Sequence, residues 1–305
     1  MNPSTVVSME RIRALSKPSA PRAIFWALAA WVTIVALAVL DSRFGNPLTT
    51  VLVVLLIANQ QHALLIQMHD ASHWRLSQHR WLNDLVGELL CAWPMFFRMA
   101  AYRENHRMHH LHANTALDPD FRPGRFPKSK EQALKMLVLD VLALNTFEQL
   151  GELKRLKKPT SAKLKLARLA FYGTAAALIT WAGLWPQVLL YWVVPLFTWL
   201  KVILRLRAIA DHAGVEQQAR PYDTRTVVPT LVDRLFVAPR NCSYHFGHHA
   251  YESVPWFNLK ALHVELMQHP ELRARVRVTR GFHRLLDELP SASLGAPAPA
   301  PTSAG

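Results

Sequence analysis

Four long apolar segments constrain the fold of this chain more than any other feature of its sequence. A helix crosses the hydrocarbon core of a bilayer with about 20 apolar residues, and each segment is that long or nearly so. The segments are Ala23–Leu40, Leu48–Met68, Leu166–Trp185 and Gln187–Leu204. Short turns join the first to the second and the third to the fourth. We therefore expect an all-α integral membrane protein whose four transmembrane helices form two hairpins.

Lysine and arginine residues are distributed unevenly around these segments, and their excess marks the cytoplasmic side. The stretch 1–22 is polar and basic, and so are the segment between the hairpins and the residues after Lys201. The first hairpin turn holds only Arg43, and the second holds no basic residue. Both termini and the middle segment are thus predicted to be cytoplasmic. No small-residue cleavage site follows the first apolar segment, which favours a retained span over a signal peptide.

Two further segments are predicted to be helical without crossing the membrane. Charged residues and Pro94 interrupt the apolar run Leu82–Ala101, which favours an interfacial or re-entrant helix. A crossing there would place His69 and His106 on opposite sides of the membrane. Glu131–Leu150 is amphipathic and is expected on the surface.

The sequence predicts a single domain with a short segment at each end. We expect one membrane domain over residues 23–289, preceded by the cytoplasmic segment 1–22. The tail 290–305 is rich in Pro, Ala and Ser and is predicted to be disordered.

Composition narrows the chemistry available to the chain. The formal net charge is +14 and the pI is near 10.2. No basic stripe interleaved with aromatic residues is present, so we predict contact with anionic lipid head groups and not with nucleic acid. The two cysteines, Cys91 and Cys242, form no C-x-x-C pair, which argues against a disulfide scaffold and a thiolate metal site.

Eight of the 15 histidines fall into three short clusters. The first, His69-Asp70-Ala71-Ser72-His73, places two imidazoles at i and i+4, on one face of a helix. The other two, in 106–110 and 245–249, have the pattern HxxHH. With histidine at about 5% of positions, chance gives roughly 0.04 such matches in a chain of this length. A lone histidine is usually an ordinary hydrogen-bonded residue, but three clusters on one predicted side of the membrane indicate metal binding.

The size of this histidine set also predicts the number of metals. A structural zinc takes four ligands and a catalytic zinc takes three with a water, so eight imidazoles imply two metal ions. Imidazole binds Fe, Zn, Cu and Ni alike, and the ligand type leaves the choice of metal open.

The three clusters, their order and their positions relative to two helical hairpins closely resemble the membrane fatty acid desaturase superfamily, which also contains acyl hydroxylases and carotenoid ketolases. The resemblance covers about Gln60 to Glu288. Four further stretches are similar to those of bacterial fatty acid desaturases, namely 81–88 (WLNDLVGE), 114–120 (NTALDPD), 224–226 (TRT) and 253–259 (SVPWFNL).

The resemblance implies two iron ions, held by the three clusters and by one lone histidine before the third cluster, the place that His212 occupies. The implied ligands are His69, His73, His106, His109, His110, His212, His245, His248 and His249. It also implies O2 as co-substrate. Because no haem segment or flavin fingerprint is present, electrons are expected from an external ferredoxin or cytochrome with its reductase. The expected location is the bacterial inner membrane.

The chain departs from the family pattern near the third cluster. Many acyl desaturases continue after it with Leu-Phe-Pro, whereas this chain reads Ala250-Tyr251-Glu252. Gly247 stands where an acidic residue is common, and Ala208 stands where some relatives have asparagine. These differences leave the dimetal site intact and leave the substrate subclass open.

Acidic neighbours that could accept the second N–H of a ligating imidazole are Asp70, Glu104, Asp118, Asp120, Asp211 and Glu252, although an ordinary capping or surface role is favoured for each. Weak candidates for contact with a substrate head group are Arg98, Tyr102, Arg103 and Trp256, for which ordinary interfacial anchoring is an equal alternative. His62 is expected to hydrogen-bond a neighbouring helix. Surface or supporting positions are expected for His79, His112, His263, His269 and His283.

No side-chain acid or base can activate a methylene group, so the implied chemistry needs a metal-based oxidant. We expect O2-dependent desaturation of a long acyl chain carried by a lipid or a thioester. The alternative is a related di-iron hydroxylase or carotenoid ketolase acting on a lipid. A metal transporter or scaffold is less favoured, because it would carry ionisable residues inside its spans, and these spans are nearly free of charge.

Overall fold

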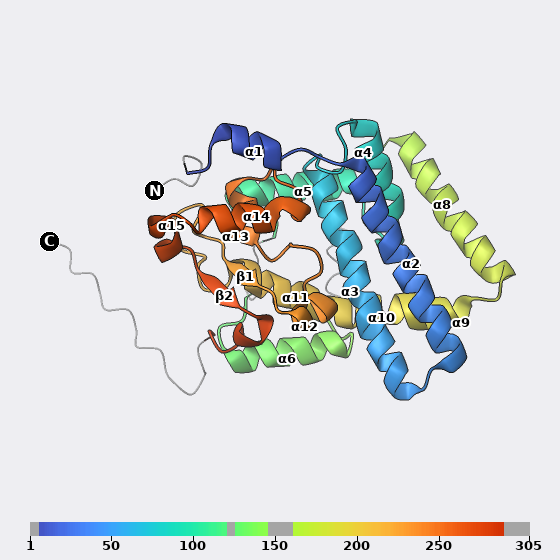
Figure 1. Cartoon of the computed structure of the whole chain (residues 1–305). Helices are drawn as coiled ribbons and strands as arrows, with labels where there is room; N and C mark the ends of the chain where they lie inside the picture. Colours follow the sequence, from blue (N-terminus) through green and yellow to red (C-terminus); the bar gives the residue numbers. More distant parts are fainter. Residues whose placement is uncertain (1–5, 121–125, 146–160, 290–305) are drawn as a thin grey trace.

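The computed structural model describes residues 6–120, 126–145 and 161–289, and helices dominate it (Figure 1). The predicted tail 290–305 lies outside the described residues. In chain order the elements are α1 (Met9–Leu15), α2 (Ala20–Phe44), α3 (Pro47–Ser72), α4 (Arg80–Val86), the π-helical η2 (Gly87–Ala92), the 3-10 turn η3 (Trp93–Met95), α5 (Met99–His112), α6 (Lys130–Val141), α8 (Ala162–Trp181), α9 (Trp185–Val188), the π-helical η4 (Leu189–Val193), α10 (Val194–Phe197), α11 (Trp199–His212), β1 (Thr226–Val228), α12 (Leu231–Phe236), α13 (His245–Ala250), α14 (Trp256–Leu266), α15 (Pro270–Arg275), β2 (Val278–Arg280) and the 3-10 turn η5 (Phe282–Arg284).

Three helices of the described residues are long and apolar enough to cross a membrane. Two of them, α2 and α3, form a hairpin and contain the first two predicted spans. The third is the helical run Trp185–His212, which joins α9, η4, α10 and α11 and contains the predicted span Gln187–Leu204. These helices fit a membrane protein.

The helix α8 covers most of the remaining predicted span but is not among these three. It begins at Ala162, before the predicted span, and carries Lys163, Lys165 and Arg168 in its first two turns, of which only Arg168 lies within that span. None of its residues is buried, and it stands at the outer edge of the molecule (Figure 1). The fourth crossing therefore stays a prediction, as does the cytoplasmic placement of the termini.

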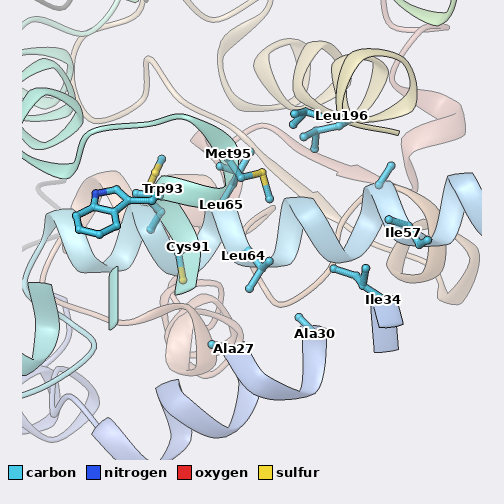
Figure 2. Close-up of a cluster of buried hydrophobic side chains, with 14 of the residues drawn as sticks. Ala27, Ala30, Ile34, Ile57, Leu64, Leu65, Cys91, Trp93, Met95 and Leu196 are labelled. Carbon is cyan, nitrogen blue, oxygen red and sulfur yellow. The ribbon is translucent and has the colours of Figure 1, made fainter. Parts of the chain in front are cut away.

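Small side chains let α2 approach α3 closely. Ala23, Ala27, Ala30 and Ile34 recur every three or four residues, so they share one face of α2, and all four are buried. Figure 2 shows members of this stripe opposite α3, whose Leu64 belongs to the same apolar cluster. Helices in lipid associate through such close packing, because the hydrophobic effect gives them little reason to prefer each other over lipid chains.

Hydrogen bonds to the carboxylate of Asp41 connect α2 and α3 close to the turn of this hairpin. Asp41 near the end of α2 is buried and accepts hydrogen bonds from the hydroxyls of Thr49 (3.0 Å) and Thr50 (2.7 Å) at the start of α3. The hydroxyl of Tyr191 in η4 donates a third bond of 2.9 Å. Asn46 caps α3 by accepting from the backbone N–H groups of its first turn. One buried acidic group thus joins three helical segments.

The polar side chains in the middle of α3 bind backbone carbonyls of other elements. The amide of Asn59 donates to Arg234 O (3.0 Å), and that of Gln61 donates to Trp192 O (2.9 Å). Nδ1 of His62 lies 2.9 Å from Val237 O, directly after α12. His62 therefore bonds the main chain at the end of a neighbouring helix, as expected.

The interrupted apolar segment before α5 is not one straight helix. α4 passes into the π-helical η2 and the 3-10 turn η3, which holds Pro94, and Phe96 then adopts a left-handed conformation (φ 64°). Cys91 and Trp93 pack into the core between α2 and α3. This broken path agrees with a segment that does not cross the membrane as a regular helix.

A group of short elements, here called the cap, includes α1, α13, α14 and the strands β1 and β2. It lies beside the C-terminal half of α3, away from the hairpin turn (Figure 1). Its apolar core joins Ile12 and Leu15 of α1 to Phe246 and Leu262 of α13 and α14. β1 and β2 form a two-stranded parallel sheet in which Val227 pairs with Thr279. The predicted surface helix Glu131–Leu150 is observed as α6 up to Val141, and its residues 146–150 lie outside the described part.

Removing the Asp41 carboxylate should destabilise the hairpin. Side-chain hydrogen bonds inside membrane proteins average about 0.6 kcal/mol, so losing three predicts a loss of about 2 kcal/mol for Asp41→Ala. Thermal unfolding in detergent measures this loss. Thr33→Ala is the control, since its hydroxyl bonds only Ala29 O of its own helix. Equal unfolding temperatures for Asp41→Ala and Thr33→Ala would contradict the assignment.

Candidate metal centre

The nine histidines predicted as ligands come from four separate elements. His69 lies in the last turn of α3 and His73 is the residue that caps it. The second cluster lies on α5, His212 is the last residue of α11, and the third cluster forms most of the short helix α13. All but His73 are buried, and the side chain of His73 is only 11% exposed.

The nine side chains gather into two groups, within each of which one nitrogen per ring lies within 4.8 Å of the others. The five-histidine group holds His69, His73, His106, His110 and His248. The four-histidine group holds His109, His212, His245 and His249.

The helical period explains how each HxxHH cluster serves both groups. Residues at i and i+4 share a face, so His106 and His110 enter one group together, and His245 and His249 enter the other. The histidine at i+3 turns toward the opposite group in each cluster. Consecutive residues do not face each other on a helix, which is why the paired histidines separate.

The arrangement of nitrogen atoms suits a cation at each group. Nε2 of His110 lies 3.0 Å from Nε2 of His106 and 3.0 Å from Nε2 of His248. Nε2 of His245 lies 3.2 Å from Nε2 of His212. Between neutral rings such approaches leave lone pairs facing each other unless a proton or a cation lies between them. Buried Nε2 atoms of His69, His73 and His249 have no hydrogen-bond partner, which is unusual in a protein interior.

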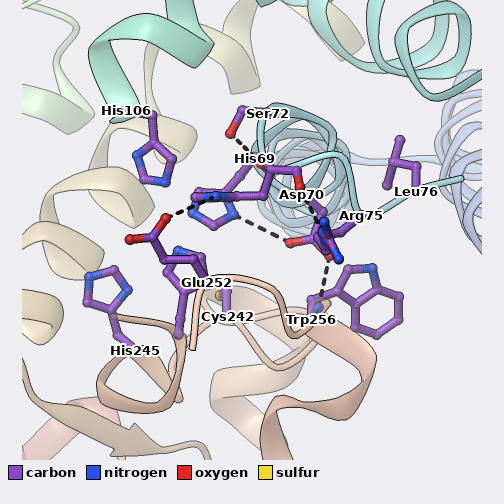
Figure 3. A network of polar contacts seen from close by, with 12 residues as sticks. His69, Asp70, Ser72, Arg75, Leu76, His106, Cys242, His245, Glu252 and Trp256 are labelled. Atoms are coloured by element: carbon purple, nitrogen blue, oxygen red, sulfur yellow. Dashed lines mark hydrogen bonds and ion pairs between the residues drawn. The ribbon is translucent and has the colours of Figure 1, made fainter. Parts of the chain in front are cut away.

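Carboxylates contact the outer nitrogens of both groups at four of the six acidic candidates, for which the sequence had favoured ordinary capping or surface roles. Asp118 Oδ2 lies 2.9 Å from His109 Nδ1, and Asp211 Oδ2 lies 3.6 Å from His245 Nδ1. Figure 3 shows Asp70 beside His69, with its Oδ1 3.4 Å from Nδ1, and Glu252 pointing toward the histidines. Glu252 Oε1 lies 3.2 Å from His110 Nδ1. A proton held on Nδ1 leaves the Nε2 lone pair for a metal.

The other two acidic residues have different surroundings, and Asp120 forms a third potential metal group with His109 and Asp118. Glu104 pairs with Arg107 at 2.7 Å on the exposed side of α5. The backbone N–H of Asp120 donates to Asp118 Oδ1 (2.8 Å), which helps to hold that carboxylate in place.

The outer contacts of His212 were not foreseen. Its Nδ1 lies 3.3 Å from the backbone carbonyl of Asp223 and 3.4 Å from the side-chain amide nitrogen of Asn114. The Asn114 amide donates to the same carbonyl at 2.8 Å. Tyr102, predicted only as a head-group contact, stacks on His106 with ring centroids 5.5 Å apart. A backbone acceptor carries no sequence signal, so only the fold could reveal it.

Burial disfavours the protonated form of several of these imidazoles. Desolvation, with a smaller contribution from neighbouring imidazoles, lowers the pKa of His73 to about 3 and holds the pKa values of His106, His248 and His249 well below 6.5. Burial alone would raise the pKa of Asp118, but its hydrogen bond and charge interaction with His109 outweigh this and lower that pKa. Neutral imidazoles and an ionised carboxylate are the forms that a metal site requires.

The remaining predicted residues lie outside the two groups. Arg103 pairs with Asp84 (2.5 Å) and stacks on Trp74, with 3.7 Å from its guanidinium carbon to the ring centroid. The backbone N–H of Trp256 donates to Asp70 Oδ2 (2.8 Å), so this residue braces the first cluster. His263 was expected at the surface or in a position that supports the ligands. It is buried and its ring packs against that of Tyr244.

Comparison with known proteins gives one family and several similar sequences. The family model described as fatty acid desaturase matches residues 45–280. A dihydrorhizobitoxine desaturase of Bradyrhizobium elkanii is 25% identical over 243 residues, which cover 72% of this chain and 68% of that protein. An sn-1 oleoyl-lipid 12-desaturase of Anabaena variabilis is 25% identical, covering 67% of each chain. Another, of Synechocystis sp., is 26% identical, covering 66% of this chain and 63% of the other.

These matches confirm the resemblance to bacterial fatty acid desaturases that the histidine clusters indicated. The matched region begins at the α2–α3 turn and includes all nine histidines. The chain belongs to the fatty acid desaturase family.

Proposed function

We propose that this protein is a di-iron desaturase that uses O2 to introduce a double bond into a long acyl chain held by a lipid or a thioester. Membership of the family makes it an oxidoreductase of lipid metabolism. The observation that carries the finer proposal is the pair of histidine groups, each with its nitrogens within 4.8 Å of one another. Each group would hold one iron ion.

The residues supply the positions and the protonation states that such a centre needs. All nine imidazoles would offer one lone pair each, and Asp118, Asp70, Asp211 and Glu252 would hold protons on the outer nitrogens. The buried surroundings exclude bulk water, which would otherwise quench a strong oxidant.

When bound, the two irons supply an oxidant able to break the C–H bonds of an unactivated methylene. The overall reaction consumes one O2, two electrons and two protons, and it converts –CH2–CH2– to –CH=CH– with release of two waters. The electrons come from an external carrier, a ferredoxin or a cytochrome with its reductase. A net charge of +14 favours association with an acidic carrier.

The relatives support an acyl substrate. Two of them are named for desaturating oleoyl groups on lipids, and the third is named for dihydrorhizobitoxine. The long apolar helices α2 and α3 fit a membrane protein, and acyl chains are available in membranes. We propose the bacterial inner membrane, with both termini and the histidine groups on the cytoplasmic side.

Metal analysis tests the assignment of two iron sites. The purified protein loaded with iron-57 should contain two irons per chain and give a coupled Mössbauer signal. His248→Ala removes a member of the five-histidine group and His109→Ala a member of the other, and each variant should be inactive. His79→Ala, an exposed histidine outside both groups, should retain two irons and full activity. A single zinc in the wild-type protein would overturn the proposal.

The lipids of cells that express the protein distinguish the possible reactions. A desaturase should produce acyl chains with one additional double bond, two mass units lighter than their precursors. These chains should be absent from cells expressing His248→Ala. A hydroxylated or keto product, formed in place of the alkene, would instead identify the related hydroxylase or ketolase activity.

Acid should destabilise the metal-free protein. Because burial lowers the histidine pKa values in the folded state, the unfolded chain binds more protons once the pH falls below about 6.5. Stability is then complete above pH 7 and is lost toward pH 3, by about 1.4 kcal/mol per pH unit for each such histidine. Unfolding temperatures of the metal-free protein between pH 7.5 and 5.5 measure this loss. An unfolding temperature that stays constant or rises on acidification would contradict neutral buried histidines.

A further inference from the structure

Glu252 occupies an unusual place among the carboxylates around the histidines. The side chains of Asp70, Asp118 and Asp211 are at most 7% exposed, whereas that of Glu252 is 47% exposed. It follows α13 directly, at the point where the sequence replaces the Leu-Phe-Pro of many relatives. A partly exposed carboxylate at this position therefore reaches both solvent and the histidine cluster.

Glu252 contacts two histidines of the same group. Its Oε1 lies 3.2 Å from Nδ1 of His110, and its Oε2 lies 3.8 Å from Nδ1 of His73. The two rings are nearly perpendicular, with centroids 4.9 Å apart. His73 comes from the end of α3 and His110 from α5, so one side chain contacts ligand candidates on two elements besides its own.

Both contacts lie on the outer side of the rings. Nε2 of His110 faces the Nε2 atoms of His106 and His248 at 3.0 Å, and Nε2 of His73 is buried without a hydrogen-bond partner. The carboxylate thus faces the nitrogens that point away from the centre of the five-histidine group. Its negative charge lies within 3.2 Å of one Nδ1 and 3.8 Å of the other, which favours a proton on each of these atoms and leaves the Nε2 atoms toward the centre.

We propose that Glu252 is a positioning residue that sets the ring orientation and tautomer of His73 and His110, and thereby the metal affinity of the five-histidine group alone. This inference rests on the proposed two-iron site. The four-histidine group has its own outer partners in Asp118, Asp211 and the Asp223 carbonyl. Loss of Glu252 should therefore affect the two metal positions unequally.

Iron retention and Mössbauer spectra of the full-length protein test this selectivity. The wild type loaded with iron-57 should hold two irons during a graded challenge with a chelator. Glu252→Ala should lose one iron at about 10- to 100-fold lower chelator concentration, the usual effect of removing an outer partner of a ligand. The second iron should resist the chelator as in the wild type. The Mössbauer parameters of the weakened site alone should change.

Two variants separate this role from a general effect on folding. Glu252→Gln keeps the shape, but its amide oxygen serves only one ring while its NH2 group faces the other, so the loss should be smaller than for alanine. Glu265→Ala is the matched control. It removes the ion pair between Glu265 of α14 and Arg11 of α1, which contacts none of the histidines, so this variant should bind both irons normally. Metal-free Glu252→Ala should unfold at the same temperature as Glu265→Ala.

Three outcomes of these measurements would contradict the role proposed for Glu252, and each has a different meaning. Two irons of wild-type affinity in Glu252→Ala would refute the role of Glu252 and leave the di-iron proposal standing. Equal weakening of both irons, together with a lower unfolding temperature of the metal-free variant, would assign Glu252 a structural role instead. Fewer than two irons in the wild type would overturn the di-iron proposal itself, and this inference with it.

Discussion

The interior of this protein depends on satisfying nine imidazole rings that are packed against one another. A buried polar nitrogen without a partner costs free energy, and here several Nε2 atoms either lack a partner or face another nitrogen at about 3 Å. A cation at the centre of each group and acceptors around the outside would satisfy these nitrogens. Asp118, Asp70 and the Asp223 carbonyl supply acceptors on the outer side. The short elements of the cap are placed where these requirements can be met.

The spacing of the histidines explains how two short helices, α5 and α13, each contribute to both histidine groups. In each HxxHH cluster the i and i+4 histidines enter one group and the i+3 histidine enters the other. The two clusters take opposite assignments, since α5 gives two residues to the five-histidine group and α13 gives two to the four-histidine group. A shift of one residue in either helix would turn its histidines away from both groups. The loops that fix the rotation of α5 and α13 are thus as important as the histidines.

Much of the site could be predicted from the sequence because histidine clustering is local and rare. The nine residues were found by spacing and by resemblance, and the fold brings all nine together. Contacts that depend on tertiary structure were not foreseen. The Asp223 carbonyl that binds His212 is a backbone group, and the three-hydroxyl environment of Asp41 unites residues from three helices. The predicted span Leu166–Trp185 overlaps α8 without sharing its ends, because an apolar run does not mark where the basic first turns of a helix begin.

The helix α3 shows how a membrane protein can bury such a polar site. Its first turns are exposed, with Leu48 79% and Val51 58% accessible, as expected for a helix that meets lipid. From Ile57 onward nearly every residue is buried by other parts of the protein, including polar ones. Irregular and polar structure is tolerated at membrane depth only where protein surrounds it. By ending inside a cap of its own chain, α3 carries His69 away from both lipid and bulk water and into the five-histidine group.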